Sequence, residues 1–80
     1  MKVSILTPEK NLFEGQAKSI MLPGLYGIFE VLDQHAPIIA ALGKGSIKLT
    51  DENGNKQKFD ISKGFCEVLN NEVNLLVRVS

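Results

Sequence analysis

The chain has 80 residues, 44% of them hydrophobic and 22% charged, which suits one folded domain spanning residues 1–80 and leaves no room for a second core. Nine Lys and Arg balance nine Asp and Glu, and the basic residues are scattered singly, so we expect no nucleic-acid partner. The single cysteine, Cys66, has no disulfide partner in the chain, so a protein of a reducing compartment is expected. No stretch approaches the roughly 18 apolar residues of a membrane span, so the protein is expected to be soluble or peripheral to a membrane.

Alternation of apolar and polar residues dominates the chain and predicts β-strands. In chain order, this period of two occurs at Val3 and Ile5, at Ile20 and Leu22, at Ile47 and Leu49, and at Phe59 and Ile61. Residues 28–32 and 38–42 are also expected to be strands, and Cys66 is expected in the core. The clearest alternation covers residues 72–79, whose inward side should consist of Val73, Leu75, Val77 and Val79, with Leu76 facing outward.

Turn-forming residues separate these strands at short intervals, for example at Gly15, at residues 43–45 and at residues 62–64. Asn53-Gly54 predicts one two-residue hairpin turn, and Asn70-Asn71 predicts a second one of type I′, because Asn tolerates positive φ. These hairpins should join the last four strands into a meander. Short strands with such spacing indicate a β-sandwich or a β-barrel.

Residues 22–37, LPGLYGIFEVLDQHAP, hold the strongest signal of a binding surface. Pro23-Gly24 predicts a turn in which Gly24 supplies the positive φ, and Gly27 frees the backbone again before the next strand. Leu25 and Tyr26 are large apolar residues in a segment expected at the surface. They predict a docking site, unless they fold back onto the domain's own open end.

Signals of catalysis or of a bound cofactor are weak. His35 is the only histidine, and a turn histidine that hydrogen-bonds to the backbone is favoured over a catalytic base. No spacing of His and Cys fits a metal site, and the glycine pairs at residues 24 and 27 and at residues 43 and 45 lack the context of a phosphate-binding loop. We expect no catalytic residue, no metal and no cofactor.

Lys44 supports one alternative function. It lies between Gly43 and Gly45 in an expected turn, as does the modified lysine of lipoyl and biotinyl carrier domains. The Asp-Lys-Ala or Met-Lys-Met flanks of those carriers are absent here, so a solvated turn lysine is favoured. A β-sandwich that binds an unknown ligand is a third possibility.

Four stretches together resemble a known family. The run LPGLYGIFEVLDQHAP, the opening VSILTPEKNLFEGQAKSIMLPG, the central IIAALGKGSIKL and the closing SKGFCEVLNNEVNLLV are similar to the N-terminal domain of the epsilon subunit of F-type ATP synthases, called delta in mitochondria. The family often has Gly at the position of Glu30, and Pro-Gly or Pro-Asn at Asp33-Gln34. These departures affect the expected shape of the loop and not the expected fold.

The resemblance implies an all-β fold, a small antiparallel β-sandwich of about ten short strands. It implies a non-catalytic rotor subunit of the central stalk of a proton- or sodium-driven ATP synthase, which docks the gamma subunit to the c-ring and couples ion flow to ATP synthesis. The c-ring contact would be formed by Gly24, Leu25, Tyr26, Gly27 and Ile28. The gamma contact would be formed by Glu30, His35, Ala36, Ile38, Phe65 and Glu67.

Two further expectations follow from the resemblance. The subunit should lie at the cytoplasmic face of a bacterial plasma membrane, or alternatively at the stromal face of a thylakoid. Most bacterial members continue into a helical hairpin that can restrain ATP hydrolysis, and the sequence stops at Ser80. We therefore expect neither inhibition by helix insertion nor ATP sensing, whether the chain is naturally short or an excised domain.

Overall fold

The computed structural model describes residues 1–79, which form seven strands. In chain order they are β1 (Lys2–Leu6), β2 (Asn11–Gly24), β3 (Gly27–Leu32), β4 (Ile38–Leu42), β5 (Gly45–Asp51), β6 (Lys56–Leu69) and β7 (Glu72–Val79). No helix occurs between residues 1 and 79, and so none that could cross a membrane. The all-β prediction is confirmed.

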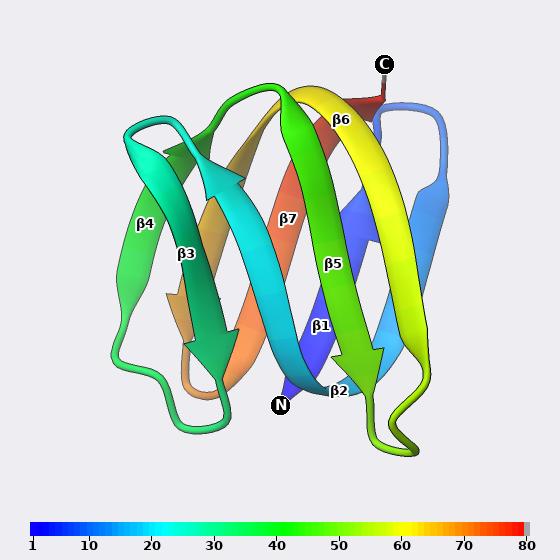
Figure 1. Ribbon diagram of the computed structural model, residues 1–80, viewed down its shortest axis with the longest axis vertical. Helices are drawn as coiled ribbons and strands as arrows, with labels where there is room; N and C mark the ends of the chain where they lie inside the picture. Colours follow the sequence, from blue (N-terminus) through cyan, green and yellow to red (C-terminus); the bar gives the residue numbers. More distant parts are fainter. Residues whose placement is uncertain (80) are drawn as a thin grey trace.

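The strands pack as two layers that share their two longest members (Figure 1). β2 and β6 have 14 residues each and bend, so that one half of each strand lies in one layer and the other half lies in the other layer. The first half of β2 pairs with β1, and the second half pairs with β3 and β5. Pairing runs without a break through β1, β2, β5, β6, β7 and back to β1, which closes this part of the sandwich into a ring.

The expectation of about ten short antiparallel strands is wrong. Gly15 and residues 62–64, which resemble turns in the sequence, lie inside β2 and β6. The ladders shift register between Ala17 and Ser19 and between Ile61 and Lys63, and such irregularities bend a strand without ending it. The sheet is also mixed, because β1 runs parallel to β7. The last part of the chain is consequently a meander of three strands, β5, β6 and β7, and not four.

Most of the core consists of inward residues that alternation predicts, and Met1, Ala17, Val31, Leu42 and Val68 complete it. Cys66 is buried among them, as expected, and Phe59 is partly buried against them. Val79 is an exception, since it is exposed at the end of β7. The predicted and fully buried residues are Val3, Ile5, Ile20, Leu22, Ile47, Leu49, Ile61 and Leu75, and Val73 and Val77 are nearly so.

The two Asn-containing turns differ. Asn70 and Asn71 have φ values of 52° and 61° and connect β6 directly to β7, which confirms the two-residue hairpin. The β5–β6 connection spans residues 52–55 and is longer than expected. The Asp51 carboxylate accepts hydrogen bonds from the backbone N–H groups of Asn53 and Asn55, both at 2.9 Å, and this arrangement holds the longer loop.

Candidate docking surface

The β2–β3 turn lies two positions later than the sequence suggests. β2 continues through Pro23 to Gly24, and the turn itself is formed by Leu25 and Tyr26. Gly27, with φ of 142°, has the positive φ that was expected at Gly24. Gly24 is required for a different reason, because a Cβ there would collide with the carbonyl oxygen of Gly27. The turn therefore depends on the close approach of two backbones.

The tip exposes three large apolar side chains. Tyr26 is 100% exposed, Ile28 75% and Leu25 58%, so the tyrosine does not fold back onto the domain. The tip is nevertheless held firmly. The backbone N–H of Leu25 donates to the carbonyl of Ala41 at 2.9 Å, and the N–H of Gly43 donates to that of Pro23 at 2.8 Å. Two backbone hydrogen bonds thus anchor an exposed apolar tip, and exposed apolar patches commonly mark interaction sites.

A second part of the surface is the side of the sandwich where pairing ends. β3 pairs with β2 alone, and β4 pairs with β6 along its length but touches β2 only at Leu42. Glu30 lies on β3, His35 and Ala36 lie in the connecting loop, and Ile38 begins β4 with its side chain partly buried against the core. Four of the six predicted gamma contacts therefore follow one another along this edge.

The loop at this edge is fixed by a small polar cluster. The Asp33 carboxylate accepts hydrogen bonds from the N-terminal ammonium of Met1 at 3.2 Å and from Asn71 Nδ2 at 2.8 Å. Asn71 Oδ1 in turn accepts from the backbone N–H of Gln34, whose φ of 66° is unusual for a non-glycine residue. The hydrogen bond from Asn71 and the ammonium charge lower the pKa of Asp33. The departure Asp33-Gln34 is thus accommodated by distant partners.

His35 contacts the backbone of its own loop. Its Nδ1 lies 2.6 Å from the carbonyl oxygen of Ala36, to which a protonated Nδ1 donates. This confirms the interpretation of His35 as a turn histidine. Within residues 1–79 no group of three or more His, Cys, Asp and Glu is placed to hold a metal ion.

The third part of the surface is the outer face of the layer that β4, β6, β7 and β1 form, which we call the back layer. Phe65 and Glu67 are exposed here, and Phe65 belongs to a row that crosses four strands. In this apolar row, the directly paired residues are Ala41 on β4, Phe65 on β6, Leu76 on β7 and Leu6 on β1. The outward position of Leu76 is evident from alternation, but Ala41 and Leu6 are not singled out by the sequence, because their alignment depends on the register between strands.

Two further reactive side chains are Cys66 and Lys44. Burial, with a smaller effect from the Glu67 carboxylate, raises the pKa of Cys66 to about 11, so the thiol is a poor nucleophile. Lys44 is exposed on the loop between β4 and β5. The fold and the surface together define a small β-sandwich with an exposed apolar tip, an edge and an apolar face.

Comparison with known proteins identifies the family. Residues 1–79 match the family described as ATP synthase, Delta/Epsilon chain, beta-sandwich domain. The chain is 40% identical over 75 residues to the ATP synthase epsilon chain of Chlorobium limicola, covering 94% of this chain and 85% of that one. It is 38% identical over 77 residues to the epsilon chain of Leptospira interrogans, covering 95% and 59%. The chain belongs to the ATP synthase delta/epsilon family, which is a family of non-catalytic subunits.

Solved structures show the same fold at low sequence identity. A chain of the Euglena gracilis mitochondrial ATP synthase superposes with a TM-score of 0.88 at 21% identity, over 94% of this chain and 48% of that one. A chain of the Tetrahymena thermophila mitochondrial ATP synthase superposes with a TM-score of 0.80 at 19% identity, over 98% and 63%. The resemblance drawn from the sequence motifs is confirmed. Membership of this family is favoured over the alternative that Lys44 carries a lipoyl or biotinyl group.

Proposed function

We propose that this chain is a central-stalk subunit of a bacterial F-type ATP synthase that docks the gamma subunit to the c-ring and couples proton flow to ATP synthesis. The observation that carries the proposal is the rigid apolar tip at Leu25 and Tyr26. Family membership supports it, as does the Tetrahymena structure, which contains the central stalk and c-ring. The chain would lie at the cytoplasmic face of the plasma membrane and be held there through the complex.

The c-ring contact is proposed at the tip. Leu25, Tyr26 and Ile28 supply exposed apolar area, and Gly24 and Gly27 shape the turn that presents it. Aromatic residues contribute strongly to protein interfaces because they bury much area with little loss of conformational freedom. A tip held by two backbone hydrogen bonds to its neighbours also loses little entropy on binding.

The gamma contact is proposed along the edge and the adjoining back face. Gamma would contact the edge residues Glu30, His35, Ala36 and Ile38, and would continue over Phe65 and Glu67. A stable interface of standard size buries about 1,200 to 2,000 Å² in total, which is more than the edge alone can offer. The apolar row beside Phe65 extends the available area across the back layer.

Mechanically, the fold suits the transmission of torque. The hydrogen-bonded ring of β1, β2, β5, β6 and β7 leaves no hinge between the two layers, and close-packed cores have low compressibility. Residues 1–79 contain no helix, so we propose that the domain they form couples the rotor without restraining hydrolysis by helix insertion.

Co-elution on size exclusion with the gamma subunit of the same ATP synthase tests the proposal. We expect a complex, and an ATPase assay of the assembled head should show no strong inhibition that ATP relieves. Tyr26→Ala should leave thermal stability unchanged and weaken assembly with the c-ring, whereas Tyr26→Phe should retain it. If the wild-type chain does not bind gamma, the proposed function is wrong.

A further inference from the structure

An apolar groove of about 550 Å³ opens at the end of the sandwich that also carries the β2–β3 tip. Its floor is formed by Leu42 and Val77, which are almost fully buried, and by Gly64. Leu6, Pro8 and Leu76 form its walls. This volume lies within the range of about 300 to 1,000 Å³ that is typical of ligand pockets.

The groove depends on a glycine at its floor. A Cβ at Gly64 would lie 2.8 Å from Val77 Cγ1 and 3.0 Å from the backbone oxygen of Leu76, closer than packed atoms allow. Gly64 thus lets β6 and β7 approach each other, because atoms of Val77, Leu76 and Leu42 already stand where its side chain would be. Leu42 and Val77 remain at the base of the groove.

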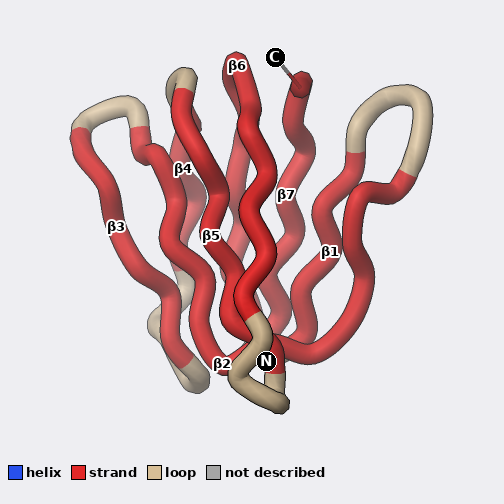
Figure 2. The backbone as a smooth tube through the Cα atoms, turned by 45° about the vertical axis from the view of Figure 1, so that its right-hand side comes forward, coloured by secondary structure: helices blue, strands red, loops and turns tan. Residues whose placement is uncertain are grey.

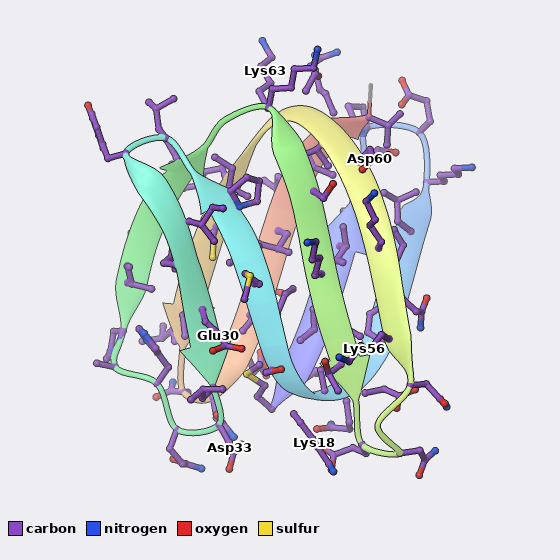
Figure 3. All side chains as sticks on the ribbon, in the orientation of Figure 1. Lys18, Glu30, Asp33, Lys56, Asp60 and Lys63 are labelled. Atoms are coloured by element: carbon purple, nitrogen blue, oxygen red, sulfur yellow. The ribbon has the colours of Figure 1, made fainter. Side chains whose placement is uncertain are left out.

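Two cations, Lys63 and Arg78, also line the groove, and they are placed directly opposite each other on β6 and β7. Like charges at opposite positions of a strand pair destabilise it. Neither forms an ion pair within residues 1–79, and no Asp or Glu lines the groove. Figure 3 shows Lys63 and Asp60 toward this end, with Glu30 and Asp33 toward the other end of the sandwich; Asp60 accepts a hydrogen bond from Ser46 Oγ at 2.6 Å and is not part of the groove. A carboxylate bound between the two cations would turn their repulsion into attraction.

We propose that this groove receives a segment of the gamma subunit in which a large apolar side chain stands next to an Asp or Glu. The inference rests on the proposed function and specifies the chemistry of its partner. Gamma is favoured because the groove and the apolar row share Leu6 and Leu76, so that the partner proposed for the row also reaches the groove. The apolar side chain fills the floor above Leu42 and Val77, and the carboxylate lies between Lys63 and Arg78.

Charge reversal with a matched control tests this assignment. The variant Lys63→Glu/Arg78→Glu reverses both cations of the groove. The control Lys18→Glu/Lys56→Glu changes the net charge equally, at exposed positions near the opposite end of the molecule (Figure 3). Thermal unfolding of both variants should match that of the wild type, because all four side chains are exposed. The affinity of each for gamma is then measured at two salt concentrations.

We expect the groove variant to bind gamma roughly 10- to 100-fold more weakly than the control at about 0.05 M salt, and the difference to shrink at about 0.5 M. Equal affinities of the two variants would overturn the inference and leave the proposed function standing. Failure of the wild type to bind gamma would overturn both. If the groove variant binds gamma normally but no longer sediments with phosphatidylglycerol vesicles that the wild type binds, the groove belongs to an anionic lipid and the inference is wrong.

Discussion

Two neighbouring leucines on β7 allow the inward and outward faces of the sandwich to be compared directly. Leu75 is fully buried and is paired with Ile5 and Cys66, which are also fully buried, whereas Leu76 is 59% exposed. Leu75→Ala removes fully buried methyl groups and leaves a cavity, so we expect the free energy of unfolding to fall by about 3 kcal/mol. A domain of this size has a free energy of unfolding of about 4 to 12 kcal/mol, so the loss is a large part of the total.

Chemical and thermal denaturation of both variants measure the difference. Leu75→Ala should lower Tm by roughly 12 to 24 °C, and Leu76→Ala should change the free energy of unfolding by less than about 0.5 kcal/mol. Both substitutions remove the same atoms from the same strand, so strand propensity cancels in the comparison. Equal losses, or a larger loss at Leu76, would refute the assignment of the inward face. Leu76→Ala should instead weaken binding to gamma.

Three further predictions concern single sites. Gly24→Ala should lower the free energy of unfolding by about 1 to 3 kcal/mol, because its Cβ would collide with the backbone of Gly27. Gly43→Ala is the control in the same denaturation assay, because its Cβ would meet Leu25 Cδ1 at an ordinary 3.6 Å. The pKa of Asp33 is lowered from 3.8, so its stabilising effect is fully present above that pH and is lost as the pH falls through the lowered value. Asp33→Asn should therefore have a lower Tm than the wild type at pH 7, and the two should converge in acid; a constant difference would argue against the ion pair. Finally, burial raises the pKa of Cys66 to about 11, so a thiol reagent at pH 8 should label the chain only after unfolding, and rapid labelling of the native protein would show that the thiol is accessible.

The loops of the chain gather at the two ends of the sandwich (Figure 2). The β2–β3 tip and the groove share one end through the pairing of Gly24 with Leu42. Leu25 and Tyr26 stand out in the sequence because large apolar residues occupy a turn. The groove does not stand out, because its walls come from β1, β6 and β7, which are far apart along the chain.

Local sequence alone determined the features that depend on a few neighbouring residues. Alternation identified the inward residues of the strands, because successive side chains of a strand point to opposite faces whatever the strand pairs with. Asn70-Asn71 predicted its turn because both residues tolerate positive φ. The motifs around LPG and HAP identified the family for the same reason, since they are contiguous.

Tertiary structure decided what depends on distant pairing. Whether β2 and β6 break or bend depends on the strands beside them, so the number of strands could not be counted from turn residues. The parallel pairing of β1 with β7 joins the two ends of the chain and brings Leu6 beside Leu76. Alternation predicts which face a side chain takes but not which residue lies opposite it on the neighbouring strand. The apolar row and the repulsive pair of Lys63 and Arg78 depend on this register between strands.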